Sequence, residues 1–253
     1  MSSLQPTERF SDRVADYINY RPDYPDTLFV YLTEQHGLTS DHVVADIGSG
    51  TGLLTKHFLE NGNRVYGVEP NTNMRRAAEQ MLQTHSRFTS ICGQAEATTL
   101  PDTSVDWVVA GQAFHWFALD KTRQEFERIL KPKGQIALIW NDRLQQDPFQ
   151  QAYETFLLTH CADYKQVNHR RLAPETLANI FAPRSMVMAI FENAQVLDYR
   201  GLQGRLLSCS YAPKAGAANY EVMMTDLKGL FDRHSQQEKL NFRYQTKLYY
   251  FAA

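Results

Sequence analysis

Between residues 41 and 141, short apolar segments alternate with helix-length amphipathic segments, and this alternation constrains the fold more than any other feature. We expect strands at 42–47, 64–68, 105–110 and 135–140, and helices at 52–61, 72–83 and 119–130. Strands that are separated by helices form βαβ units, which place them side by side in a parallel sheet. The sequence therefore predicts an α/β protein with a mostly parallel sheet.

The flanking segments are less regular. Residues 240–250 alternate with period two, which predicts a strand that pairs antiparallel with a strand in 186–198 at one edge of the sheet. Residues 7–36 are expected to be helical, with a break at 20–25 where two prolines interrupt the helix. Residues 147–181 are expected to form inserted helices. We interpret 1–253 as one domain with a core at 37–141 plus 186–253, and 7–36 and 147–181 as a helical cap.

The composition narrows the classes of function. There are 26 basic and 28 acidic residues and a net charge of -2, which argues against nucleic acid as a partner. Uninterrupted apolar runs reach only six residues and the N-terminus has no export signal, so neither a membrane span nor secretion is expected. Three cysteines without a CxxC pair predict reduced thiols and a cytoplasmic location. The eight histidines lack metal-ligand spacing, so no metal site is expected.

The strongest motif is DIGSGTG at 46–52, at the turn from the first strand into a helix. Its spacing is GxGxG, and Leu53 stands where the dinucleotide fingerprint has its third glycine. Asp46 would repel a pyrophosphate but suits an ammonium or sulfonium group. Glu69 ends the second strand, where an acid can accept both ribose hydroxyls. S-adenosylmethionine (SAM) combines a cation and a ribose without phosphate, so it fits better than NAD, and no GK[ST] follows to indicate a P-loop. The plain alternative is a tight turn beside a solvated acid.

These residues, together with four further motifs, carry a resemblance that covers nearly the whole chain. The motifs are YRPDYP at 20–25, GQAE at 93–96, QAFHWF at 112–117 and LLSCSYAP at 206–213. The chain resembles class I SAM-dependent methyltransferases of the methyltransferase type 11 group, and within it the trans-aconitate methyltransferase-like branch. The resemblance implies a Rossmann-like fold with a mostly parallel seven-stranded sheet, an antiparallel C-terminal strand and a helical cap.

The resemblance also implies a set of cofactor-binding residues. Gly48, Gly50 and Gly52 would flank the methionyl part, Met74 would pack near the adenine, and Tyr17, Tyr20 and Arg21 would close over the cofactor. Many relatives have an aspartate at the position of Gln94, so the backbone N–H of Ala95 is expected to carry part of the adenine recognition. The full set is Tyr20, Arg21, Asp46, Gly48, Ser49, Gly50, Gly52, Glu69, Pro70, Met74, Gln94, Ala95, Glu96 and Gln112.

The residues that follow the strand at 105–110 are expected to border the same crevice. Aromatic faces there attract a sulfonium by cation–π contacts, although they would serve equally well to pack the next helix. His115 is the candidate general base, or a hydrogen-bonded residue that shapes the site. Methyl transfer can also proceed without a base, because in-line placement of the nucleophile supplies much of the acceleration. The expected substrate pocket comprises Phe114, Trp116, Trp140, Arg143, Arg205, Ser208 and Tyr211.

The sequence thus predicts an enzyme, a monomer or homodimer, that moves a methyl group from SAM to a small-molecule acceptor. The segment after residue 110 is GQAF, and not the Asn/Asp-Pro-Pro-aromatic pattern of enzymes that methylate nucleic-acid bases. Arginines in the cap region suggest a carboxylic acid acceptor, because guanidinium groups bind carboxylates; they are Arg143, Arg170, Arg171 and Arg205. Two alternatives remain, a SAM-binding protein without catalysis and an NAD-dependent oxidoreductase.

Overall fold

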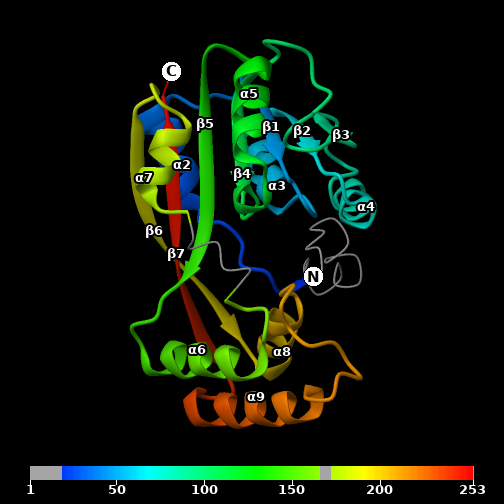
Figure 1. Cartoon of the computed structure of the whole chain (residues 1–253), viewed down its shortest axis with the longest axis vertical. Coiled ribbons are helices and arrows are strands. Elements are labelled where there is room, and N and C mark those ends of the chain that lie inside the picture. The colour runs from blue at the N-terminus through cyan, green and yellow to red at the C-terminus, as the bar shows by residue number, and fades with distance from the viewer. Residues whose placement is uncertain (1–18, 166–171, 253) are drawn as a thin grey trace.

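The computed structural model describes residues 19–165 and 172–252, and it contains one seven-stranded sheet with the order β3-β2-β1-β4-β5-β7-β6 (Figure 1). The strands are β1 (Val43–Ile47), β2 (Arg64–Val68), β3 (Phe88–Ile91), β4 (Val105–Gly111), β5 (Leu130–Arg143), β6 (Met186–Leu197) and β7 (Leu240–Phe251). β1 to β5 are parallel, and β7 pairs antiparallel with both β5 and β6. The predicted fold class and the predicted antiparallel edge are confirmed.

Helices pack on both faces of this sheet. α3 (Leu53–Glu60), α4 (Thr72–Met81) and α5 (Leu119–Ile129) are the predicted crossover helices. α2 (Asp26–His36) packs on one face through Leu28 and Leu32, in the same cluster as α3. α7 (Pro174–Ile180) packs beside α5 on the other face. The prediction that 7–36 and 147–181 form a cap is therefore wrong for α2 and α7, because their apolar residues cover the sheet.

The remaining helices form a layer of their own at one end of the molecule, hereafter the cap. It consists of α6 (Pro148–His160), α8 (Tyr199–Leu207) and α9 (Tyr220–His234), which share a second apolar core with the first half of β7 (Figure 1). Pro148 and Pro174 are the first residues of α6 and α7, a position at which proline is favoured. Neither α9 nor α8 was predicted from the sequence; in α8, Gly201 and Gly204 are unfavourable in a helix.

Two strand assignments also changed. β3 was missed because its four residues are only partly buried and have no apolar run. β5 begins at Leu130 rather than at residue 135, with a register irregularity opposite β4 between Val105 and Trp107. Residues 131–134, between the predicted helix and the predicted strand, form this irregular stretch, in which Lys133 has a positive φ of 66°. None of the helices within residues 19–165 and 172–252 has the length and hydropathy of a membrane-spanning segment.

Candidate functional site

The glycine loop lies at the carboxyl end of β1, where parallel α/β sheets bind their ligands. The backbone N–H groups of Gly48 and Ser49 donate to the carbonyl of Val68 at 2.8 and 3.2 Å, which ties the loop to the end of β2. Gly48 has a φ of 69°, and a Cβ there would lie 2.7 Å from the Cβ of Ala113. The turn that follows β4 therefore packs directly against this loop, and only glycine is tolerated at the contact.

Asp46 is a buried carboxylate at the end of β1, beneath the glycine loop. Its Oδ2 accepts a 2.6 Å hydrogen bond from Thr55 of α3, and its Oδ1 has no hydrogen-bond partner among the described residues. Burial raises the pKa of Asp46 to about 7; the charge of Glu69 acts in the same direction, and the Thr55 bond opposes it. A buried carboxylate with a spare oxygen is stabilised by a cationic ligand, because the ligand's charge compensates the loss of hydration.

Glu69 lies at the end of β2 with both carboxylate oxygens directed at backbone N–H groups. Oε2 accepts from Gly50 at 2.9 Å and Oε1 accepts from Asn71 at 2.8 Å. Burial raises the pKa of Glu69, and these two hydrogen bonds oppose the rise. Each oxygen retains a further lone pair that can accept from a ribose hydroxyl. Glu69 therefore holds the glycine loop in place and also presents an acceptor at the position predicted from the sequence.

Some of the residues predicted to contact the adenine are buried and one is exposed. Met74 of α4 and Ala95 are buried. Gln94, which lies between β3 and β4, is exposed and forms a β-bridge with Ala97. Glu96 has a structural partner, because its Oε1 accepts from the backbone N–H of Ala118 at 2.6 Å, at the start of α5. That contact accounts for Glu96 without a ligand, whereas Gln94 and Pro70 remain candidates.

The turn after β4 contains Phe114, His115 and Trp116, and the structure places Phe114 differently from the other two. Phe114 is fully buried, with its ring 5.8 Å from Phe117, 6.3 Å from Phe126 and 5.6 Å from Phe181. Its assignment to the substrate pocket is therefore wrong, since it packs the sheet core beneath α5 and α7. His115 and Trp116 are half-buried and adjacent, with ring centroids 4.9 Å apart. They remain candidates for a position beside the reacting group.

Trp140 was also predicted to line the substrate pocket, and the structure places it elsewhere. It is buried in the core that contains Phe114, edge-to-face with Tyr249. It lines a groove of about 550 Å³ on β5, β6 and β7 that includes none of the predicted cofactor residues. Successive residues of a strand point to opposite faces of the sheet. Trp140 therefore lies on the face covered by α5 and α7, and its neighbour Asn141 points to the other face.

Residues 20–24, hereafter the strap, connect the core with the cap. The ring of Tyr20 lies against Gly204 of α8, and Arg21 donates to the carbonyl of Ser208 at 3.0 Å. At the other end, Tyr24 lies against Gly111 at the end of β4, next to Gln112. Tyr20 and Arg21, predicted to contact the cofactor, are thus held on the cap side of this segment. Tyr17 lies outside the described residues.

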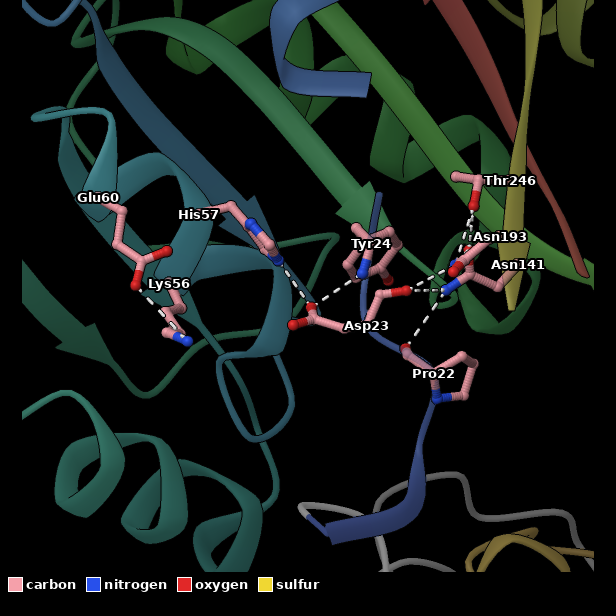
Figure 2. Close-up of polar contacts among 9 residues, drawn as sticks. All are labelled: Pro22, Asp23, Tyr24, Lys56, His57, Glu60, Asn141, Asn193 and Thr246. Atoms are coloured by element: carbon pink, nitrogen blue, oxygen red, sulfur yellow. Dashed lines mark hydrogen bonds and ion pairs between the residues drawn. The ribbon is translucent and has the colours of Figure 1, made fainter. Parts of the chain in front are cut away.

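Asp23 of the strap is tied to the helix that follows the glycine loop. Its Oδ1 lies 2.6 Å from Nε2 of His57 in α3 (Figure 2). Partial burial raises the pKa of Asp23, but the hydrogen bond and the charge of His57 outweigh this and leave the pKa below its ordinary value. Asn141 and Asn193 hold the strap from the other side. None of these polar anchors was predicted from the sequence.

The buried arginines form a cluster with tyrosines in the cap, hereafter the cap cluster: Arg143, Tyr153, Tyr164, Arg205, Tyr211 and Tyr244. The guanidinium of Arg143 lies 5.3 Å from the ring of Tyr153 and 5.6 Å from that of Tyr164, and its Nη2 pairs with Glu154 at 2.7 Å. Nη1 of Arg143 has no partner among the described residues. Arg205 donates to the hydroxyl of Tyr244 at 3.0 Å.

Arg143 and Arg205 are the cationic side chains of the cap cluster, and Cys209 lies beside Arg205. The thiol of Cys209 lies 3.0 Å from Nη1 of Arg205. Burial alone would raise the pKa of this thiol, but the charges of Arg205 and Arg21 outweigh it and lower the pKa to about 6. The hydroxyl of Ser208, predicted to contact substrate, donates instead to the carbonyl of Arg205. Arg170 and Arg171 lie outside the described residues. Within the described parts of the chain, no group of three potential metal ligands occurs.

The parallel sheet, the glycine loop tied to β2 and the two buried carboxylates form a Rossmann-like core with its candidate ligand site at the carboxyl ends of β1 and β2. Comparisons with known proteins agree: residues 45–138 match the family model for the methyltransferase domain. An uncharacterized methyltransferase of Schizosaccharomyces pombe is 33% identical over 141 residues, which cover 55% of each chain. One from Mycobacterium bovis is 34% identical over 134 residues, or 53% of this chain and 52% of the relative. The chain thus spans about half the length of these relatives.

Solved structures extend the likeness to nearly the whole chain. A type II methyltransferase structure from Anaeromyxobacter dehalogenans has a TM-score of 0.69 at 23% identity, covering 92% of this chain and 97% of that one. A phosphoethanolamine N-methyltransferase of Haemonchus contortus, solved with S-adenosylhomocysteine (SAH), has a TM-score of 0.55 at 15% identity, covering 98% and 58%. Identities this low establish the fold. Residues 45–138 thus match the methyltransferase domain model, and the chain has the Rossmann-like fold of these solved methyltransferase structures.

Proposed function

We propose that this protein is a SAM-dependent methyltransferase that acts on a small-molecule acceptor. The observation that carries the proposal is the pair of buried carboxylates at the ends of β1 and β2, beside a glycine loop. Asp46 has a spare oxygen for a cation, and Glu69 has lone pairs for two hydroxyls. This donor set fits the ammonium and ribose of SAM and opposes the pyrophosphate of NAD.

The chemistry follows from how these groups hold the ligand. Bound SAM supplies a methyl group already activated by the sulfonium. The glycine loop and Glu69 fix the ribose and the methionyl chain, Asp46 neutralises a positive charge, and His115 and Trp116 border the loop from the β4 turn. Placement of the acceptor in line with the methyl group supplies much of the acceleration, so the protein acts mainly by orientation and by exclusion of water.

Calorimetry on the purified protein tests the cofactor. We expect SAH to bind and NAD and NADP to bind far more weakly, because the nucleotides bring a pyrophosphate next to Asp46. SAH is the appropriate probe because it retains the ribose and the ammonium but cannot react. Tighter binding of NAD than of SAH would overturn the proposal in favour of an oxidoreductase. Binding of SAH without methyl transfer to any acceptor would favour the non-catalytic alternative.

For the acceptor we propose a small carboxylic acid that is methylated on oxygen. The support is the positive cap cluster, in which Nη1 of Arg143 is buried without a described partner. Glu154 already compensates Arg143, so Arg205 is the stronger candidate for binding a carboxylate. The charge of Arg205 lowers the pKa of the Cys209 thiol, and the same charge would stabilise a carboxylate bound beside Arg205 when that thiol is protonated.

A methyl-transfer screen of carboxylates against phenols and amines tests this acceptor class. We expect activity on a carboxylate, and a roughly 30- to 5,000-fold loss in kcat/KM in Arg205→Ala, about 2–5 kcal/mol for a desolvated pair. His115→Ala should cost less than about tenfold on that acceptor, because a carboxylate has no proton to remove, but about 10²–10⁴ on a phenol or amine. Activity confined to neutral phenols or amines, with Arg143→Ala and Arg205→Ala both silent, would refute the carboxylate proposal.

A further inference from the structure

The strap is held by two amide side chains from the edge strand β6. Asn193 donates from Nδ2 to the carbonyl of Asp23 at 2.7 Å, and Gln195 donates from Nε2 to the carbonyl of Tyr20 at 3.1 Å. The two residues are two positions apart, so they lie on the same face of the strand. Through these two residues, the C-terminal half of β6 anchors the strap at two places, Tyr20 and Asp23.

Asn193 belongs to a network that crosses three strands. Its Nδ2 also lies 3.2 Å from Oδ1 of Asn141 in β5 and 3.2 Å from Oγ1 of Thr246 in β7. Asn141 in turn donates from Nδ2 to the carbonyls of Pro22 at 3.4 Å and of Asp23 at 3.2 Å (Figure 2). Thr246 is fully buried and donates to Oδ1 of Asn141 at 2.5 Å. This part of the strap is therefore fixed to the sheet itself.

Gln195 connects the strap to the cap cluster through its amide oxygen. Its Oε1 accepts from the hydroxyl of Tyr244 at 2.8 Å, and that hydroxyl accepts from Nε of Arg205 at 3.0 Å. A chain of three hydrogen bonds thus runs from Arg205 through Tyr244 and Gln195 to the carbonyl of Tyr20. Arg205 and Tyr244 are buried, where such hydrogen bonds are worth most.

We infer that Gln195 is a positioning residue that couples the cap cluster to the strap, so that the state of Arg205 affects how firmly the strap closes on the cofactor. The inference rests on the proposed function, in which Arg205 faces the acceptor and the strap ends beside Gln112, in the turn after β4 that packs against the glycine loop. An acceptor that engages Arg205 acts on the same chain of hydrogen bonds as the strap. Acceptor and cofactor binding are therefore linked through Tyr244 and Gln195.

The test uses two substitutions that break the chain at different bonds. Gln195→Glu keeps the size of the side chain and can still accept from Tyr244, but it cannot donate to the carbonyl of Tyr20. Tyr244→Phe removes the hydroxyl that joins Arg205 to Gln195. Each is measured in the whole protein by thermal unfolding, SAH calorimetry and hydrogen exchange of the backbone amides in residues 20–24. Glu192→Gln is the matched control, since it makes the reverse exchange at an exposed position of the same strand.

We expect each single variant to weaken SAH binding by about two- to tenfold, the usual effect of one hydrogen bond, and to speed exchange in the strap. The double variant should be no weaker than the worse single variant, because both break one chain. The control should stay within twofold of wild type. Unchanged affinity and exchange in Gln195→Glu at an unchanged Tm, or effects that multiply in the double variant, would overturn the inference. If the wild type fails to bind SAH, the proposed function fails, and the exchange data alone decide whether Gln195 positions the strap.

Discussion

Replacing Phe114 with alanine is expected to lower the free energy of unfolding by about 3–5 kcal/mol, the usual cost of truncating a buried phenylalanine. The ring is fully buried between the β4 turn and the helices on that face of the sheet, against Phe117, Phe126 and Phe181. Its loss leaves a cavity that this close-packed aromatic group can fill only in part. Equilibrium unfolding in urea measures the change.

Two variants make this result specific. Phe114→Leu should cost much less than the alanine variant, because it keeps most of the buried volume. Leu158→Ala, at a helix position with an exposed fraction of 47%, should change stability by less than about 0.5 kcal/mol. A loss below about 1 kcal/mol in Phe114→Ala, combined with a large loss of acceptor binding, would restore Phe114 to the substrate pocket.

Replacing Glu69 with alanine is expected to weaken SAH binding by about 1.5–3 kcal/mol, roughly 10- to 150-fold, as for hydrogen bonds to a charged acceptor. The carboxylate does two things at once in this structure. It presents acceptors at the proposed ribose position, and it accepts from the N–H groups of Gly50 and Asn71. Removing it therefore loses the ligand contacts and also frees the glycine loop, which places the effect toward the upper end of that range.

Calorimetry with SAH measures the Glu69 effect, and thermal unfolding separates it from general destabilisation. Glu69→Gln should fall between wild type and Glu69→Ala, because the amide keeps one accepting oxygen and loses the other. Glu60→Ala is the control: Glu60 ends α3 on the surface and its side chain pairs with Lys56 at 3.5 Å (Figure 2). If Glu69→Ala bound SAH as tightly as wild type, the ribose would have to bind elsewhere.

Much of the core was predictable because it depends on local patterns. The helices after β1, β2 and β4 follow from amphipathic periodicity, and the antiparallel β6–β7 edge follows from the strict alternation in Leu240–Phe251. Asp46 and Glu69 were found for a related reason. Each ends a predicted parallel strand, and the carboxyl ends of such strands meet at one edge of the sheet. The glycine spacing then favoured SAM over a dinucleotide.

The errors have a different physical origin. A period-two or period-3.6 pattern shows that a segment has an apolar face, but not which apolar surface it covers. α2 and α7 were for that reason assigned to a cap when they pack on the sheet, and Phe114 was assigned to a pocket when it fills the core. Trp140 was assigned to the pocket although its side chain points into the core. Neighbouring strand residues point to opposite faces, and the sequence does not show which helices cover each face.

The sequence by itself determined the class of fold, the position of the glycine loop and the two acids beneath it, since each depends on residues close together in the chain. The tertiary structure alone decided how the strap is anchored. The strap is held by Asn141, Asn193 and Gln195, which lie between 118 and 175 positions away from the residues they contact. Single amides carry no periodic signal, and only strand pairing between β5, β7 and β6 brings their side chains to one place.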